Sequence, residues 1–265
     1  MSSEHRTSTA SVGALWSAQA TDWAELQEPQ HRPKYDDAIQ RIGIGSKHAV
    51  LDLGCGAGTF CRLAADHGAT VTGIDAAPAL VEIARGRIPE GRFDVGDIQA
   101  LPYDDYGFDR VTAFNSLQFV PEPSTALAEI RRVTKPGARV YILVWGRQEN
   151  TELVAVMKAL HPLAPPRPQG SPGAFALSAP DLLEDLVTRS GLTPHEGGYL
   201  ELPYEYPDHA TMIRAQCSSA PAVLAARASG DEKVRDAITS ALLPYRTESG
   251  GYRIHTEYRY VTATA

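Results

Sequence analysis

Three glycines at every second position, Gly54, Gly56 and Gly58, follow a short apolar run at 49–53. Glycine lets a backbone turn adopt positive φ, and its missing Cβ lets a ligand approach the main chain closely. A helical pattern begins near Thr59, and the free N–H groups at the start of a helix point back into such a turn. A strand, a glycine turn and a helix in this order predict a ligand-binding site in which the ligand contacts main-chain atoms directly.

The spacing of the glycines distinguishes this turn from the dinucleotide fingerprint G-x-G-x-x-G. The third glycine of that fingerprint would fall on Thr59, whereas this chain has its glycine one residue earlier, at Gly58. A carboxylate, Asp52, also lies inside the preceding apolar run. The glycines alone could simply make a tight connection, but together with Asp52 they disfavour a nicotinamide dehydrogenase.

Later apolar runs also end in polar side chains, at Asp75, at Asp97, and at Asn115 with Ser116. In open parallel sheets, ligands bind outside the carboxyl ends of the strands. A carboxylate at Asp75 could accept two hydrogen bonds from ribose hydroxyls, and Asp97 could accept one from an adenine amino group. Singly, Asp75 could cap a helix and Asp97 could belong to a turn. Four strand ends in register favour one ligand that contains a nucleoside.

The run 50–58 resembles VLDLGCGxG, the first motif of the class I S-adenosylmethionine-dependent methyltransferases, and matches it throughout. The run 114–119, FNSLQF, looks like the ubiquinone and menaquinone type of small-molecule methyltransferase and lacks the NPPY motif of DNA amino-methylating enzymes. The resemblance spans roughly 47–146, with a weaker match to the family's closing strands. It implies S-adenosylmethionine as cofactor, S-adenosylhomocysteine as product, and in-line transfer of the sulfonium methyl to O, N or C of a small acceptor.

The resemblance also implies roles for individual positions. The glycine turn and Asp52 would hold the methionine end of the cofactor, Asp75 the ribose, and Asp97 with Ile98 the adenine. Gln118 and Phe119 would face the substrate from the loop that follows Asn115. The residues expected to bind the cofactor are Asp52, Gly54, Cys55, Gly56, Gly58, Asp75, Ala76, Asp97, Ile98, Asn115 and Ser116.

A general base is harder to identify, and it is needed only if the acceptor's proton is not easily lost. His195, His209 and His255 lie in the late half of the chain, where a lone histidine is more often structural. His209 follows Asp208 at the start of a helical stretch and is the candidate base. The three cysteines form no C-x-x-C pair, so we expect neither a metal site nor a disulfide framework.

The elements that must position these residues alternate between strand and helix, which predicts a mostly parallel, Rossmann-like α/β sheet. In the resembled family the sixth strand is parallel and the seventh antiparallel. A helix start is expected where Ser178 would cap and Asp181 would complete an S-x-x-D box. The expected strands are 49–53, 69–74, 92–95, 109–114, 138–145, 199–206 and 252–264.

Five segments follow from this pattern: an N-terminal helical lid at 1–46, the cofactor-binding core at 47–146, a loop, helix and sixth strand at 147–206, a helical cap insertion at 207–251, and the last strand at 252–265. Trp16, Trp23 and Tyr35 in the leader could pack it onto the core or form an aromatic lid over the site, and the resemblance supports the lid. Acceptor specificity is expected in the leader, the Pro-rich stretch 162–172 and the insertion.

The composition narrows the classes of function. The chain has 265 residues, 43% of them hydrophobic, which suits one large α/β domain with an insertion. A net charge of −7 with no basic cluster argues against nucleic acid as substrate. No run approaches the roughly 18 apolar residues of a membrane span, and the start of the chain lacks a signal-peptide pattern, so we expect a cytoplasmic protein.

The interpretation that fits best is a small-molecule methyltransferase, of the kind found in secondary metabolism. Two alternatives stay open, because no compelling base is found. One is a cyclase or lyase that retains the cofactor without transferring methyl, and the other is a non-catalytic subunit that binds the cofactor for a partner.

Overall fold

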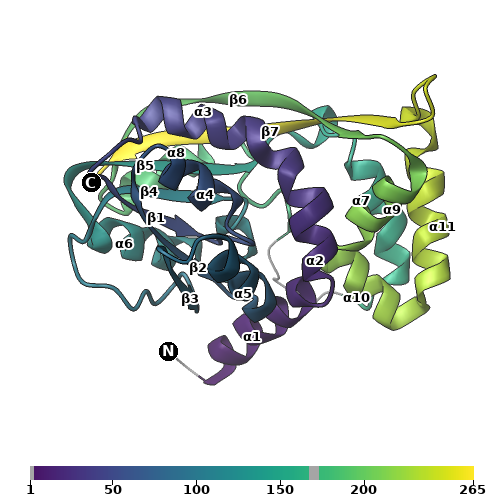
Figure 1. Ribbon diagram of the computed structural model, residues 1–265, viewed down its shortest axis with the longest axis horizontal. Coiled ribbons are helices and arrows are strands. Elements are labelled where there is room, and N and C mark those ends of the chain that lie inside the picture. Colours follow the sequence, from purple (N-terminus) through teal and green to yellow (C-terminus); the bar gives the residue numbers. More distant parts are fainter. Residues whose placement is uncertain (1–2, 167–172) are drawn as a thin grey trace.

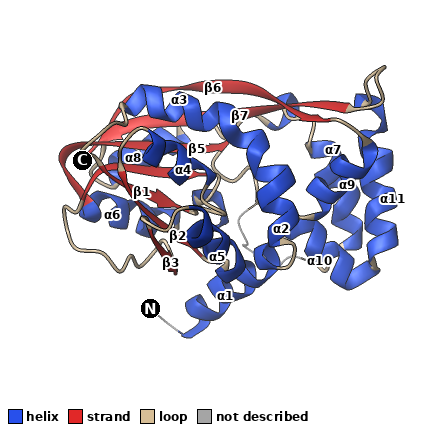
Figure 2. Cartoon of the chain, in the orientation of Figure 1, coloured by secondary structure: helices blue, strands red, loops and turns tan. Residues whose placement is uncertain are grey.

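The computed structural model describes residues 3–166 and 173–265, with side chains from residue 10 on. Within these residues a seven-stranded sheet has the order β3-β2-β1-β4-β5-β7-β6 and carries helices on both faces (Figures 1 and 2). Its strands are β1 (Ala49–Leu53), β2 (Thr70–Asp75), β3 (Arg92–Val95), β4 (Phe108–Phe114), β5 (Thr134–Trp145), β6 (Thr193–Tyr206) and β7 (Tyr252–Thr264).

The strand directions agree with the expected sheet. β1 pairs in parallel with β2 and β4, β2 with β3, and β4 with β5. β7 lies antiparallel to both β5 and β6, so β6 runs parallel to the first five strands. The prediction of a parallel sixth and an antiparallel seventh strand is therefore confirmed.

Side-chain alternation along the strands explains how both faces are covered. Val50 on β1 contributes to one apolar cluster together with α3 (Arg32–Ile42), α4 (Thr59–Asp66) and α5 (Pro78–Arg87). Its neighbour Leu51 contributes to the opposite cluster, which includes α6 (Pro123–Val133) and α8 (Leu182–Arg189). Successive strand residues point to opposite faces, so a central strand that is apolar at nearly every position must be covered twice.

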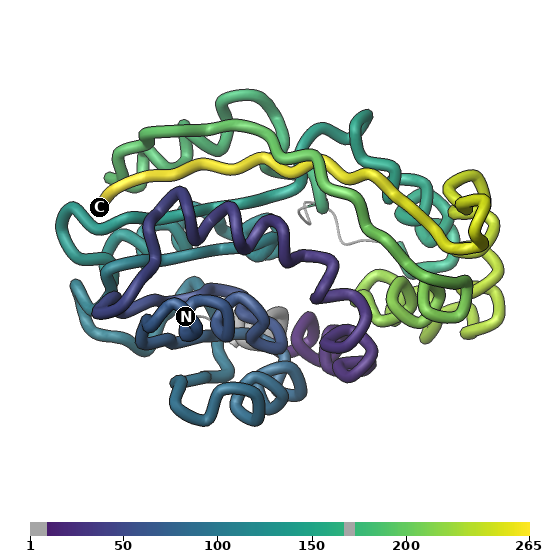
Figure 3. Tube along the Cα trace, turned by 45° about the horizontal axis from the view of Figure 1, so that its top comes forward, coloured from purple at the N-terminus to yellow at the C-terminus, as the bar shows by residue number. Residues whose placement is uncertain are grey.

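The leader crosses the molecule from α1 (Ser3–Ser17) to α3 by way of α2 (Ala20–Asp22), the π-helical turn η1 (Trp23–Gln27) and the 3₁₀ turn η2 (Glu28–His31). α1 lies against α5 and α10, as the purple trace in Figure 3 shows. The contact is close, because a Cβ on Gly13 would lie 1.8 Å from the carbonyl oxygen of Ala76. The start of the leader therefore covers the residue that follows β2.

A group of late helices lies at the end of the molecule toward which β6 extends (Figures 1 and 3). β7 runs from this group back toward the C-terminus, so the carboxyl ends of the parallel strands face the group. The remaining elements are η3 (Leu117–Phe119), η4 (Gln148–Asn150), α7 (Val154–Leu160), η5 (His161–Leu163), α9 (His209–Cys217), α10 (Ala220–Ser229), α11 (Asp231–Leu242) and η6 (Leu243–Tyr245).

Two local expectations are wrong. The serine of the expected capping box does not cap a helix, because the Ser178 hydroxyl donates to the carbonyl oxygen of Trp145 at 2.7 Å. Instead α8 begins at Leu182, after Asp181 in the left-handed region at φ 62°, with no side-chain cap. The starts of two strands also differ from the expected ones: β5 begins at Thr134, four residues earlier, with an irregular register against β4, and β6 begins at Thr193, six residues earlier.

Residues 167–172 of the Pro-rich stretch lie outside the described residues. No helix in the described part of the chain combines the length and the apolar character that crossing a membrane requires.

Candidate functional site

The glycine turn is built across the ends of β1 and β2. The backbone N–H groups of Gly54 and Cys55 both donate to the carbonyl oxygen of Ile74, at 2.8 and 3.1 Å. The φ angles of the three glycines are 78°, 54° and 84°, in the region that glycine adopts without strain. Gly58 also allows close packing, because a Cβ there would lie 3.0 Å from the Ala84 side chain on α5. The turn thus requires glycine for its backbone conformation.

Two other segments enclose the turn. A Cβ on Gly54 would lie 2.6 Å from the Cβ of Ser116, which follows β4. A Cβ on Gly56 would lie 2.6 Å from the carboxylate of Glu28, in the leader. The structure therefore brings together the turn, the end of β4 and the leader.

Glu28 is a site residue that the sequence analysis missed. Its carboxylate is 2% exposed and accepts from the Ala57 N–H at 3.0 Å, the Thr59 hydroxyl at 2.7 Å and the Arg87 guanidinium at 3.1 Å. Burial raises the pKa of Glu28 to about 7, although these partners favour the charged form. Glu28 therefore joins the leader to the backbone of the glycine turn and to the side chain of the first residue of α4.

Asp52 and Asp75 add two more carboxylates at the same turn. The buried Asp52 accepts from the Thr112 hydroxyl at 2.8 Å. Burial, together with the nearby charges of Glu28 and Asp75, raises its pKa to about 7. Asp75 accepts from the N–H groups of Gly56 and Ala77, at 2.9 and 2.8 Å, and burial raises its pKa as well. This side of the site therefore favours a cationic ligand.

A cavity of about 750 Å³ opens beside the ends of β2 and β3, and its volume falls in the range of small-molecule sites. Asp97 is part of its wall and accepts from the Gln99 N–H at 2.9 Å. The Ile98 side chain is buried in the core and does not line the cavity. The lining residues are Ala10, Ala14 and Ser17 of α1, with Ala18, Ala76, Pro78, Ala79, Val95, Gly96, Asp97 and Ala100.

Unpartnered polar atoms gather at the end of β4. Among the described residues, the Asn115 amide nitrogen, the Ser116 hydroxyl and both polar atoms of the Gln118 amide are buried without a hydrogen-bond partner. Asn115 itself is in the left-handed region at φ 50°. Buried polar groups almost always find a partner, so a polar ligand at this strand end fits the residues present.

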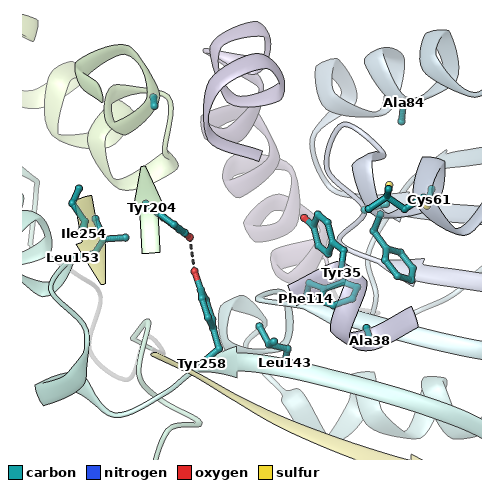
Figure 4. Close-up of a cluster of buried hydrophobic side chains, with 14 of the residues drawn as sticks. Tyr35, Ala38, Cys61, Ala84, Phe114, Leu143, Leu153, Tyr204, Ile254 and Tyr258 are labelled. Atoms are coloured by element: carbon teal, nitrogen blue, oxygen red, sulfur yellow. Dashed lines mark hydrogen bonds between the residues drawn. The ribbon is translucent and has the colours of Figure 1, made fainter. Parts of the chain in front are cut away.

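The aromatic side chains of the leader divide into two sets. The ring of Trp16 lies edge to face with those of Trp23 and Phe119, with centroids 4.6 and 6.3 Å apart, which joins the leader to the loop after β4. Tyr35 is buried against Phe114 at 4.8 Å (Figure 4). Tyr35 thus packs the leader onto the core, and Trp16 and Trp23 pack against a small apolar cluster that includes Ala57, Ala77 and Leu80. That the two tryptophans form a lid stays a prediction.

A second group of missed residues lies within the leader, on η2 and α3. The ring of His31 bonds to the Tyr204 hydroxyl at 2.8 Å, and that hydroxyl bonds to the Tyr258 hydroxyl, so that β6 and β7 meet (Figure 4). The Lys34 ammonium donates to the Asn115 side-chain oxygen at 2.8 Å. Glu28, His31 and Lys34 are spaced three residues apart, so this helical periodicity of polar residues is the signal that could have identified them.

His209, the candidate base, is the first residue of α9 and is exposed. Its ring nitrogen lies 3.1 Å from the Thr239 hydroxyl of α11, and its ring packs beside Tyr252. Both of these contacts are with the late part of the chain. The structure therefore does not bring His209 together with the residues at the strand ends.

Comparison with known proteins agrees with this geometry. Residues 51–142 match the family described as a methyltransferase domain. The chain carries a class I S-adenosylmethionine-dependent methyltransferase domain. The matched residues contain the glycine turn and the ends of β1 to β4, so the methyltransferase domain coincides with the site described above.

Relatives and solved structures extend the likeness. The chain is 31% identical over 158 residues to the ubiquinone biosynthesis O-methyltransferase of Coxiella burnetii, covering 55% of this chain and 66% of the relative. It is 33% identical over 146 residues to the demethylmenaquinone methyltransferase of Renibacterium salmoninarum, covering 53% and 61%. The chain thus spans just under two thirds of these relatives. The YcgJ protein of Bacillus subtilis shares the fold, with a TM-score of 0.61 at 19% identity over 88% of this chain and 98% of that one.

The methyltransferase domain fits its cofactor chemically. The cationic sulfonium and ammonium groups of S-adenosylmethionine suit the buried carboxylates at the glycine turn. The cavity beside β2 and β3 suits a flat purine, and the carboxylate of Asp75, which directly precedes the lining residue Ala76, suits a ribose. The unpartnered atoms after β4 suit the polar methionine end.

Proposed function

We propose that this protein transfers the sulfonium methyl group of S-adenosylmethionine to a small-molecule acceptor. The observation that carries the proposal is that Asp75, the glycine turn and the unpartnered polar groups after β4 converge at one edge of the sheet, beneath the leader. The cofactor supplies an electrophilic methyl carbon. The protein's task is then mainly to align the acceptor and to exclude water.

Each part of the site has a role in this proposal. Asp75 accepts hydrogen bonds from the ribose, and α1 closes the purine cavity. Gln118 offers a polar ligand an amide that has no hydrogen-bond partner among the described residues. The proposed role of Trp16 and Trp23 is to exclude water beside this loop, which is supported by the contact between the rings of Trp16 and Phe119. The aromatic lid and the quinone-related names of the relatives support a largely apolar, ring-containing acceptor.

The first test of the proposal is calorimetric titration with S-adenosylhomocysteine. The wild-type protein should bind it, and Asp75→Ala should lower the affinity about 10- to 100-fold, because hydrogen bonds to a charged group are each worth about 1.5–3 kcal/mol. Asp75→Asn keeps one acceptor oxygen and should lie between the two. Asp236→Ala, at an exposed position on α11, is the matched control. Unchanged affinity in Asp75→Ala would contradict the assignment.

The second test follows the methyl group itself. S-adenosylmethionine with a labelled methyl is incubated with the protein and a panel of small ring-containing acceptors. Label in a product that depends on the protein supports methyl transfer. Cofactor binding together with turnover of an acceptor but no label would instead indicate a cyclase or lyase that retains the cofactor.

A further inference from the structure

Gln118, on the 3₁₀ turn η3 that follows β4, has a buried side-chain amide that the protein leaves unsatisfied. The residue is 0% exposed, and neither its amide oxygen nor its amide nitrogen has a hydrogen-bond partner among the described residues. Burying polar groups without partners is unfavourable. Gln118 therefore carries an energetic cost that a ligand with matching groups would remove.

The other buried glutamines in the described part of the chain show how such a side chain is normally accommodated. Gln27 and Gln216 both form a hydrogen bond with the Tyr206 hydroxyl, at 2.7 and 2.9 Å. Gln99 accepts from a backbone N–H at 3.1 Å. Since each of these amides has a protein partner, the unsatisfied amide of Gln118 is the one that suits a ligand.

The geometry of η3 separates its three side chains. With three residues per turn, successive side chains of a 3₁₀ helix point about 120° apart. Leu117 packs into the apolar cluster on the α6 and α8 face of the sheet. The ring of Phe119 lies with its centre 6.3 Å from that of Trp16 in the leader. Gln118 therefore points in a third direction, at the carboxyl end of a parallel strand, where ligands bind in sheets of this kind.

A primary amide offers one specific pattern of hydrogen bonds. Its oxygen accepts, its nitrogen donates, and the two atoms are neighbours in one plane. The complementary ligand presents a donor and an acceptor on neighbouring atoms, as the edge of a lactam does. A ligand with only a carbonyl, or only a donor, would leave half of the buried amide without a partner, and sites of this kind reject such ligands strongly.

We propose that Gln118 selects the methyl acceptor, and that the acceptor is a ring compound with a hydrogen-bond donor and acceptor on neighbouring atoms. This inference rests on the proposed function. Ser116 lies against Gly54 of the glycine turn, on the cofactor side of the site, and Gln118 follows two residues later. The rings of Phe119 and Trp16 near this loop support a flat acceptor. Because an amide does not titrate, Gln118 orients the acceptor and does not remove its proton.

The test compares two ring probes on the protein loaded with S-adenosylhomocysteine. 2-Quinolone presents an N–H and a carbonyl on neighbouring atoms, whereas 1-methyl-2-quinolone lacks the donor. The wild-type protein should bind 2-quinolone at least about 10-fold more tightly in titrations followed by ligand NMR, as expected when one buried hydrogen bond is lost. In Gln118→Leu the two probes should bind alike. Gln40→Leu, at an exposed position on α3, is the matched control and should keep the preference.

A change in hydrogen-bond pattern distinguishes recognition from packing. Gln118→Glu keeps the size of the side chain but replaces its donor with a second acceptor. This variant should prefer protonated 2-aminoquinoline, which presents two donors on neighbouring atoms, over 2-quinolone by about 10-fold. The wild-type protein and Gln40→Glu should have the opposite preference. Binding of S-adenosylhomocysteine reports that each variant is folded.

The stability of the ligand-free protein gives an independent readout. Gln118→Leu removes two unsatisfied polar atoms and keeps an apolar side chain of similar size. Replacing an unsatisfied buried polar group in this way is neutral or stabilising. The urea concentration at the midpoint of unfolding should therefore stay the same or rise.

Four results would overturn the inference. They are failure of the loaded wild-type protein to bind 2-quinolone, equal binding of the two quinolones by the wild-type protein, an unchanged preference in Gln118→Leu, and a lower urea midpoint in Gln118→Leu. The last result would show that the amide is a structural support with partners in the protein. Failure of the wild-type protein to bind S-adenosylhomocysteine would count against the proposed function instead.

Discussion

Glu28 shows how one buried side chain can organise a ligand site from a distance in sequence. Its carboxylate accepts from the backbone of Ala57 and from the Thr59 hydroxyl, so it supports both the glycine turn and the start of α4. The same carboxylate lies near Asp52 and raises the pKa of that group. Glu28 therefore fixes the backbone of the turn. Together with Asp52 it also concentrates negative charge there, which suits a cationic ligand.

The raised pKa of Glu28 predicts a pH-dependent stability. Its pKa rises from the 4.5 of a solvated glutamate to about 7 in the folded protein, so the folded state binds more protons between these values. The free energy of unfolding should consequently fall as pH increases from about 4.5 to 7. In Glu28→Gln this decline should be smaller by about 1–3 kcal/mol, since one pKa unit corresponds to about 1.4 kcal/mol.

Urea unfolding at pH 5 and pH 8 measures this difference. The buried Asp52 also titrates over this window and contributes to the decline in both proteins, so only the difference between them reports on Glu28. Glu25→Gln, at an exposed position in the preceding turn η1, should retain the wild-type decline. Identical declines in all three proteins would rule out Glu28 as their source.

At the scale of elements, α1 forms one wall of the cavity beside the carboxyl ends of β2 and β3. The residues that α1 contributes to this wall are small. Gly13 lets α1 approach the carbonyl of Ala76 closely, because any side chain there would overlap it. α1 therefore depends on one glycine for its position over the end of β2.

Gly13→Ala tests this dependence. The new Cβ would lie 1.8 Å from the Ala76 oxygen, so α1 must move away and the cavity must open. We expect S-adenosylhomocysteine affinity to fall about 10-fold, which corresponds to about 1.4 kcal/mol of lost contact, with faster hydrogen exchange confined to α1. Gly86→Ala on α5 is the matched control, because no atom of the described part of the chain lies within 4 Å of the added carbon. Equal affinity in both variants would show that α1 is not part of the binding site.

At the scale of the whole molecule, the leader, the long strands and the inserted helices are joined by buried hydrogen bonds. The Tyr206 hydroxyl at the end of β6 donates to the Gln27 side chain of the leader at 2.7 Å. It accepts from the Gln216 amide of α9 at 2.9 Å. All three side chains are buried. The exposed ion pair between Asp22 and Arg214 joins the same elements, but exposed pairs contribute little to stability.

Tyr206→Phe should therefore destabilise the protein as a whole. The substitution leaves two buried polar groups without their partner, and each such group costs about 1–3 kcal/mol. Denaturant unfolding should show a single transition at lower urea concentration, with a loss of about 2–4 kcal/mol. Tyr106→Phe, at a position that is 52% exposed, should have no measurable effect. A loss confined to the inserted helices, seen as a separate early transition, would show that the three parts are not coupled.

Much of the fold and half of the site could be predicted from local sequence. The strand, glycine turn and helix at 49–66, and the acidic ends of β2 and β3, lie where the pattern placed them. The prediction of a Ser178 cap was wrong because the hydroxyl donates to the carbonyl oxygen of Trp145, a partner distant in sequence. Lys34 was missed for the same reason, since its partner Asn115 comes from another element. Local patterns report only on neighbours along the chain.

The sequence by itself determines the sheet and its alternation with helices, because apolar periodicity is a property of short segments. It also determines the glycine turn at which a nucleoside can bind, because positive φ is a property of single residues. The side chains that complete the site around the glycine turn could be recognised only in the folded chain. Glu28 and Lys34 lie in the leader, yet one supports the glycine turn and the other reaches the end of β4. The energy of a buried charge depends on what surrounds it in space, and that environment exists only once distant segments have packed together.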